Sequence, residues 1–150
     1  MQSINSSIKS LNLQKTAKVA GIAYLLIIII PMLSLLFVNP IITVEGDNIA
    51  TLKNIVANEI IFRIDNTITL LMFVAVIILA LALYKILKPV NKQLALIALF
   101  WRFAEALIGI VAVLVNFILL SFISNEQNIE RMGEDSFYAL AELLLGVYWD

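Results

Sequence analysis

The sequence contains no cysteine and no histidine. These absences exclude disulfide bonds, thiolate nucleophiles and imidazole bases, and they remove the usual ligands of zinc, copper and haem. Hydroxyls are present at Ser34, Ser121, Ser124 and Ser136, but no histidine can serve as their base. There is also no Walker loop and no Gly-x-Gly-x-x-Gly motif. We therefore expect no enzymatic activity, no catalytic or metal-binding residues and no cofactor.

Charged residues are also scarce, at 14% of the 150-residue chain, whereas soluble proteins carry about 25%. Apolar residues reach 62%, against roughly 45–50% in a soluble globular domain. A small soluble fold cannot cover so much apolar surface, because most side chains of a small domain lie near water. The composition predicts a single transmembrane domain over residues 1–150, with the lipid bilayer as its solvent.

Three apolar segments are long enough to cross a bilayer, and we place the spans at about 19–38, 60–87 and 94–123. Each overlaps a charge-free stretch of 19 or 20 residues. At ~1.5 Å per residue, a helix of this length covers the ~30 Å hydrocarbon core. A β-barrel would need strands of about 10 residues that alternate in polarity, and residues 74–83 do not alternate. The sequence predicts an all-α, polytopic transmembrane helical bundle.

The first span contains Pro31, which lipid-embedded helices tolerate as a kink when neighbouring helices satisfy the freed carbonyl. Pro31 and Ser34 can mark a hinge, although we favour a static kink. Asn39 and Pro40 predict the end of this span. Its apolar run is longer than the hydrophobic region of a signal peptide, which has roughly 7–15 residues, and no small-x-small cleavage site follows. We therefore expect a retained signal anchor.

A fourth apolar segment, at 137–149, has 13 residues and is too short to cross a bilayer. We favour a truncated fourth span, and a re-entrant or interfacial segment is the alternative.

Between the first two spans, apolar residues recur at helical spacing from Asp47, which predicts an amphipathic helix at about 47–59 with Asp47 as its N-cap. This extracytoplasmic helix lies either on the outer leaflet or packed against the bundle.

The charged residues predict the orientation of the spans. Lysines without any acidic neighbour precede the first span and follow the second, and both groups should face the cytoplasm by the positive-inside rule. The other two connections are mainly acidic. We therefore place the amino terminus in the cytoplasm and the chain in the cytoplasmic (inner) membrane. The basic flanks are Lys9, Lys15, Lys18, Lys85, Lys88 and Lys92.

A stripe of polar and small residues within the third span is the main candidate for a functional site. Its members are spaced by four, three, four, three and four residues, so they share one narrow helix face. Arg102 and Glu105 can neutralise each other, and Glu105 lies ~16 Å from the inner boundary if the helix starts near Leu94. Because a charge inside a span is costly unless paired or turned inward, this stripe should point at other helices. The stripe consists of Ala98, Arg102, Glu105, Gly109, Ala112 and Asn116.

Arg63 and Asp65 at the outer end of the second span, and Glu142 in the fourth segment, can join Arg102 and Glu105 in one cluster open to the outside. The favoured interpretation is structural: Arg102 and Glu105 form an ion pair that sets helix register, and Asn116 forms a hydrogen bond to another helix. The alternative is a pathway for a solute, ion or proton built on these ionisable groups.

Several segments together resemble one known family. They are Lys15–Gly21 before the first span, Glu59–Arg63 at the entry to the second, Ala80–Lys92 at its end, and Leu94–Leu96 with Arg102 in the third. In order and spacing they are similar to the prokaryotic polytopic membrane proteins grouped as domain of unknown function 4386. The resemblance implies a prokaryotic inner-membrane setting and more spans than this sequence contains. No established activity comes with the family name.

Taken together, these observations predict an integral membrane protein that is a non-catalytic structural, regulatory or assembly component. The alternative is a small-solute or proton-coupled carrier or channel component that uses Arg102 and Glu105. The expected partners are the lipid bilayer and either further copies of the chain or other membrane subunits. Nucleic-acid binding is not expected, because the basic residues form only short flanks beside the spans.

Overall fold

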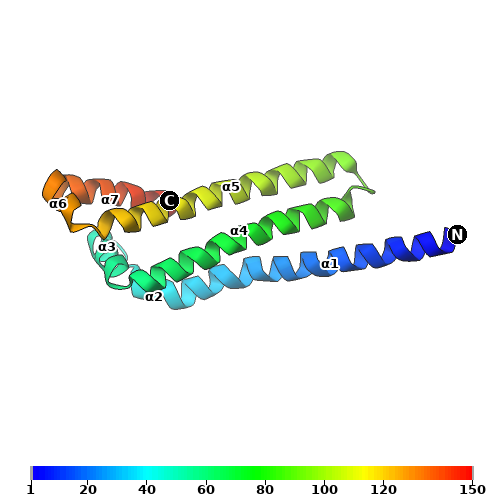
Figure 1. The fold of residues 1–150 in the computed structure, drawn as a ribbon, viewed down its shortest axis with the longest axis horizontal. Helices are drawn as coiled ribbons and strands as arrows, with labels where there is room; N and C mark the ends of the chain where they lie inside the picture. Colours follow the sequence, from blue (N-terminus) through cyan, green and yellow to red (C-terminus); the bar gives the residue numbers. More distant parts are fainter. Residues whose placement is uncertain (1, 150) are drawn as a thin grey trace. The chain divides into compact units, whose positions relative to one another are not determined.

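The computed structural model describes the backbone of residues 2–149 and the side chains of residues 13–125 and 127–146. Within this part of the chain every regular element is helical (Figure 1). The elements are α1 (Gln2–Leu33), the π-helix η1 (Ser34–Val38), α2 (Asn39–Ile42), α3 (Asn48–Ala57), α4 (Glu59–Leu87), α5 (Lys92–Ile123), α6 (Glu126–Met132) and α7 (Glu134–Trp149). The predicted all-α fold is therefore confirmed.

Among the described residues, three helical segments are long and apolar enough to cross a membrane. They are Leu13–Ile42, Glu59–Leu87 and Lys92–Ile123, with 30, 29 and 32 residues. At ~1.5 Å per residue each exceeds the ~30 Å of a hydrocarbon core. The three predicted spans thus correspond to three observed helices, with the second and third boundaries displaced by no more than two residues.

The first span continues beyond its predicted end. Asn39 and Pro40 do not terminate the helix, because η1 leads directly into α2 and the helical path reaches Ile42. Pro40 lies in the first turn of α2, directly after η1, and does not end the helical path. Ahead of η1, Pro31 lies inside α1. The wide π-turn at Ser34–Val38 therefore follows the proline by less than one helical turn.

The helices divide into two compact units, and α1, α4 and α5 contribute to both. Unit 1 consists of Met1–Ile29 and Leu71–Ile108, and unit 2 of Ile30–Leu70 and Gly109–Asp150. In unit 1, Ala20 and Ala23 of α1 pack against Ala75, Leu79 and Ala82 of α4. Small side chains allow the two backbones to approach closely, which is the usual means of packing helices in lipid.

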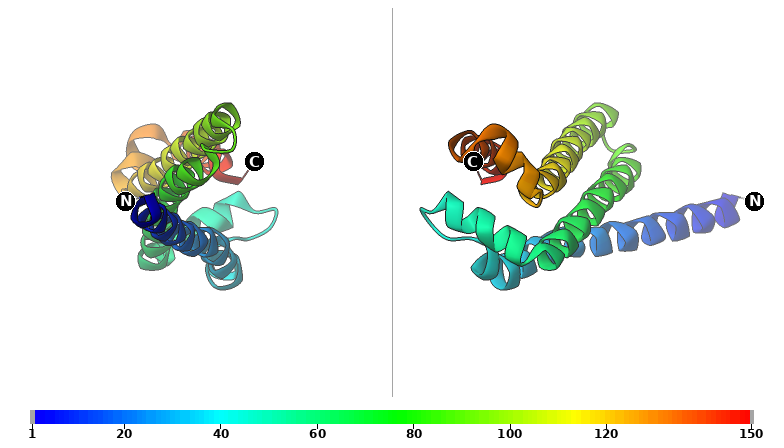
Figure 2. Two further views of the ribbon diagram at one scale, coloured as in Figure 1. Left: turned by 90° about the vertical axis from the view of Figure 1, so that its right-hand side faces the viewer. Right: turned by 60° about the vertical axis from the view of Figure 1, so that its left-hand side comes forward.

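In unit 2, large apolar side chains form the core. The aromatic rings of Phe122 and Phe137 stack with their centroids 5.0 Å apart, joining α5 to α7. Beyond the end of α5, α6 and α7 follow, and α7 runs back beside the C-terminal part of α5 (Figures 1 and 2). The buried core residues are Ile42, Leu52, Ile55, Phe62, Leu119, Leu120, Ile123, Phe137, Ala141 and Leu145.

The predicted amphipathic helix is α3, and Asp47 is its N-cap, with the Ala50 N–H donating to Asp47 Oδ1 at 2.8 Å. The buried face of α3 carries Leu52 and Ile55, which belong to the core of unit 2. Of the two expected positions for this helix, the structure shows the packed one. Ile60, just beyond α3, lies in α4 and is exposed.

Candidate functional site

The ion pair predicted between Arg102 and Glu105 is present in unit 1. Arg102 Nη1 lies 2.8 Å from Glu105 Oε2 and 3.1 Å from Glu105 Oε1, so one guanidinium nitrogen contacts both carboxylate oxygens. The two side chains are spaced i,i+3 on α5, which places them side by side on the helix surface. They remain 33% and 43% exposed. The pair is formed, but it is not enclosed.

The rest of the polar stripe on α5 is covered unevenly. Asn116 is fully buried, and Gly109 and Ala112 are partly buried, but Ala98 and Glu105 are exposed. Because Ala98 and Glu105 are not covered within this one chain, the expectation that the whole stripe points at other helices stays a prediction for these two residues. In unit 1 the buried residues of α5 are Ala95 and Ala106, and at ~100° per residue Ala98 and Glu105 lie well to one side of them.

A buried hydrogen bond joins α4 to α5 within unit 2. Asn116 Nδ2 donates to Asn66 Oδ1 at 2.7 Å, and Asn66 Nδ2 donates to the Phe62 carbonyl at 2.8 Å. The two side chains are 1% and 2% exposed. The predicted role of Asn116, a hydrogen bond to another helix, is confirmed. The only sequence signal for Asn66 as the partner of Asn116 is a second amide within an apolar run. The register between helices is not visible in sequence.

A second polar contact in unit 2 joins the first span to α4. The side chain of Ser34, the first residue of η1, lies close to the Asp65 carboxylate. Both side chains are partly buried. They border a cavity of about 290 Å³ whose other walls are apolar, formed by Ile30, Leu33, Phe37, Val38, Ile61, Ile64 and Ile68. The sequence singled out Asp65 as an intramembrane acid and Ser34 only as a hinge marker.

Arg63 and Glu142 do not contribute to the contacts described so far. Arg63 Nε donates to Glu59 Oε1 at 2.7 Å, an i,i+4 pair at the start of α4 whose side chains are 52% and 38% exposed. Glu142 is a partly buried residue of α7. Each of the two ion pairs among the described residues joins side chains of one helix, α4 for the first pair and α5 for the second. Arg63, Asp65 and Glu142 belong to unit 2, whereas Arg102 and Glu105 belong to unit 1, and their predicted cluster stays a prediction.

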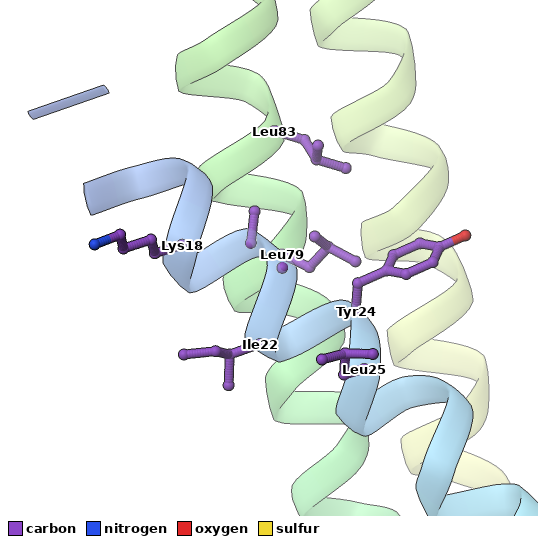
Figure 3. Close-up of a pocket in the computed structure, with 8 residues that line it drawn as sticks. Lys18, Ile22, Tyr24, Leu25, Leu79 and Leu83 are labelled. Carbon is purple, nitrogen blue, oxygen red and sulfur yellow. The ribbon is translucent and has the colours of Figure 1, made fainter. Parts of the chain in front are cut away.

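Unit 1 contains a larger and more open cavity, of about 680 Å³, between α1 and α4. Figure 3 shows the Lys18 side chain directing its amino group away from Leu79 and Leu83, two residues of α4 in the cavity wall. Apart from Lys18, only Tyr24 among the lining residues carries a polar side-chain atom. This cavity is therefore an apolar groove without a charged group directed into it.

With the two units and their polar contacts placed, the chain can be compared with known proteins. A family model described as Domain of unknown function (DUF4386) matches residues 19–150. The chain belongs to the DUF4386 family. The match covers α4, α5 and all of the first span from Val19 onward, so the resemblance inferred from sequence is confirmed. Searches of curated proteins and of solved structures returned no match to this DUF4386 chain.

The chemistry that these sites allow follows from their polar groups. In the described part of this DUF4386 chain, no three Asp, Glu, His or Cys residues gather as metal ligands. Every buried side-chain nitrogen or oxygen described has a hydrogen-bond partner. Asn66 and Asn116 therefore leave no buried polar atom without a partner, as is usual for buried polar groups. Asp65 beside its cavity and the exposed Arg102–Glu105 pair are ionisable groups of the spans that border open space.

Proposed function

We propose that this DUF4386 chain is a non-catalytic, multi-pass component of the cytoplasmic membrane that assembles with a second copy through the Arg102–Glu105 face of α5. The observation that carries this proposal is the exposure of a complete ion pair within an apolar span. In lipid such a pair is costly unless other polar groups or helices surround it. A covering helix removes the pair from the acyl chains and gives it further hydrogen-bond partners.

The second copy is supported by the arrangement of the two charges. Arg102 and Glu105 lie on one helix face, separated by a single turn. In a two-fold symmetric interface residue i of one subunit meets residue j of the other and the reverse. Two parallel α5 helices that cross near these residues can therefore place each guanidinium against both carboxylates. Ala98 lies on the same face and has a small side chain, which permits close approach.

Disulfide cross-linking in membranes tests this assembly, because the natural chain has no cysteine to interfere. Ala98→Cys lies on the proposed interface, and Phe100→Cys is a matched control that is exposed on the opposite side of α5. We expect an oxidised dimer with Ala98→Cys and little with Phe100→Cys. Equal cross-linking at both positions, or none at either, would contradict the proposal.

The role of the charges is tested in the Ala98→Cys background. Combining Arg102→Met with Glu105→Gln should reduce the dimer several-fold, because the buried polar contacts at the interface are lost. The combination of Glu59→Gln with Arg63→Met is the matched control, since it removes the other ion pair of the described residues. A dimer that persists unchanged without Arg102 and Glu105 would show that these residues do not hold the copies together.

The orientation that we propose keeps the amino terminus and the α4–α5 turn in the cytoplasm. Lys85 lies in the last turn of α4, and the Lys88 amino group lies 5.6 Å from the Tyr84 ring centroid. These lysines and Lys92 form the basic side predicted by the positive-inside rule. The Lys9 side chain lies outside the described residues.

Labelling of single cysteines in intact cells tests this orientation. Val90 in the α4–α5 turn and Gln127 in α6 are exposed and are suitable positions. A membrane-impermeant maleimide should label Gln127→Cys and leave Val90→Cys unlabelled until the cells are opened. Labelling of Val90→Cys in intact cells would reverse the proposed topology.

A carrier or channel component for small solutes or protons is the second candidate function. The observation that favours it is a cavity of about 320 Å³ in unit 1, bordered by Arg102, Tyr84 and Trp101. In proteoliposomes containing a pH-sensitive dye, this function predicts a proton flux that Glu105→Gln reduces and Glu59→Gln does not. Absence of flux with the natural chain would argue against a proton pathway.

A further inference from the structure

The cavity beside Asp65 in unit 2 lies where the helical pitch of the first span changes. A π-turn contains more backbone per turn than an α-turn, and such turns occur often at functional sites. Here η1 begins at Ser34, which lines the cavity beside Asp65 of α4. On the same side of the contact, Phe37 and Val38 of η1 line the cavity together with Ile61, Ile64 and Ile68 of α4.

Asp65 brings an acidic group into this apolar wall without a neighbouring cation. Neither ion pair of the described residues includes Asp65, and the nearest arginine in sequence, Arg63, is paired with Glu59. A carboxylate has roughly four acceptor positions, and the Ser34 hydroxyl can supply a hydrogen bond to one of them. An intramembrane acid of this kind usually pairs with a cation or marks a binding site.

The composition of the cavity wall limits what can bind there. A hard metal ion such as Ca²⁺ requires six to eight oxygen ligands, and Mg²⁺ requires near-octahedral oxygen geometry, whereas this wall offers one carboxylate and one hydroxyl. An anion would be repelled by Asp65. An organic cation with an apolar body fits both properties of the wall, since its ammonium group can pair with Asp65 while its carbon atoms contact the isoleucines. The Phe37 ring can add a cation–π contact.

We propose that the Ser34–Asp65 cavity binds a small lipophilic monocation, such as a primary ammonium with a short alkyl body. With a volume of about 290 Å³, the cavity is at the lower end of the roughly 300–1,000 Å³ found for small-molecule sites. Asp65 binds the ammonium group, Ser34 holds the carboxylate in place from η1, and the aliphatic residues bind the alkyl chain. This site is separate from the proposed assembly face, because all of its residues belong to unit 2.

Equilibrium binding of hexylammonium to the full chain in lipid nanodiscs tests this proposal, with hexanol as a neutral probe of equal length. Empty nanodiscs measure the partition of each probe into lipid, and this background is subtracted. We expect saturable binding of hexylammonium and no saturable binding of hexanol. Equal saturable binding of both probes would show that Asp65 does not select a cation, and absence of saturable hexylammonium binding would overturn the proposal directly.

Two substitutions then locate the site. Asp65→Asn preserves the size of the side chain and its ability to contact Ser34, but removes the charge, and should weaken hexylammonium binding at least tenfold. Glu59→Gln removes an exposed acid from the same helix and should change binding less than twofold. If Asp65→Asn binds hexylammonium as the natural chain does, the ammonium group is not held at this carboxylate.

A third substitution tests the cavity without altering the charge. Ile64→Phe adds volume to the cavity wall at an exposed position of α4, so the helix should still fold, and binding should weaken about tenfold. Ile60→Phe makes the same change one turn earlier, at an exposed residue that does not line the cavity. Equal effects of Ile64→Phe and Ile60→Phe would overturn the placement of the ligand, even if Asp65→Asn proved too unstable to purify.

Discussion

Unit 1 and unit 2 share α1, α4 and α5, yet their interiors are built from different residues. The buried residues of unit 1 are all apolar and are mostly alanine, as at Ala20, Ala23 and Ala82. The buried residues of unit 2 are mainly large, and they include three polar ones, Thr51, Asn66 and Asn116. Unit 1 therefore depends on close approach of helices, whereas unit 2 depends on filled volume and on hydrogen bonds between helices.

The two kinds of packing differ in how strictly they fix the register between helices. Small-residue packing needs no specific partner atoms, so it joins spans with little demand on their register. A buried hydrogen bond such as Asn116 to Asn66 allows one register only, because any shift leaves an amide unsatisfied in an apolar interior. The cavity at Asp65 also lies in unit 2, where the position of each helix is determined most closely.

The largest expected effect concerns the core of unit 2. Ile55 of α3 is fully buried among residues of α4, α5 and α7. Ile55→Ala should destabilise the protein by about 3 kcal/mol, because it removes buried carbon atoms and leaves a cavity. Unfolding by SDS in mixed micelles measures this change, and Val56→Ala, at an exposed neighbour, should have a much smaller effect. Equal effects would mean that α3 is not part of the core.

A smaller effect is expected from enlarging a residue in unit 1. Ala23→Leu inserts three carbon atoms where α1 approaches α4, and should destabilise the protein by about 2 kcal/mol through overpacking. Ala104→Leu makes the same change at an exposed position of α5, away from the Arg102–Glu105 face, and should be close to neutral in the same SDS titration. If Ala23→Leu is neutral as well, unit 1 does not depend on close approach of α1 and α4.

The spans of both units were predictable because their cause is local. Crossing ~30 Å of hydrocarbon requires about 20 apolar residues in succession, and this requirement is visible in any window of the sequence. The Arg102–Glu105 pair was equally predictable, since an i,i+3 spacing on a helix places two side chains together whatever surrounds them. Asp47 as the cap of α3 follows from the same kind of local geometry.

Contacts between helices were not predictable to the same degree. Ser34 and Asp65 lie far apart in sequence, and their closeness depends on how the first span packs against α4. The predicted end of that span was wrong because the helical path continues through the π-turn and past Pro40 to Ile42. Exposure of Ala98 and Glu105 likewise depends on which face of α5 packs in unit 1, a property of the assembled helices.

The role of hydrogen bonding in unit 2 can be measured at its buried amide pair. Asn116→Leu leaves Asn66 Oδ1 without its donor, and should destabilise the protein by about 1 kcal/mol, within the range found for hydrogen bonds between helices in lipid. Combining Asn116→Leu with Asn66→Leu removes both unsatisfied groups, so the double variant should be less destabilised than the sum of the two. Strict additivity in the SDS titration would show that the two amides do not interact.

The smallest effect should come from the ion pair that lies at the start of α4. A double-mutant cycle with Glu59→Gln and Arg63→Met should give a coupling of about 0.3–0.5 kcal/mol, because an exposed i,i+4 pair is screened by water and salt. The same cycle with Arg102→Met and Glu105→Gln should give a larger coupling, since lipid or a second copy replaces water around that pair. Raising the salt concentration should weaken the first coupling and leave the second nearly constant. If both couplings are equal and both fall with salt, water reaches Arg102 and Glu105 as freely as it reaches the end of α4, and the case for a covered face on α5 is lost.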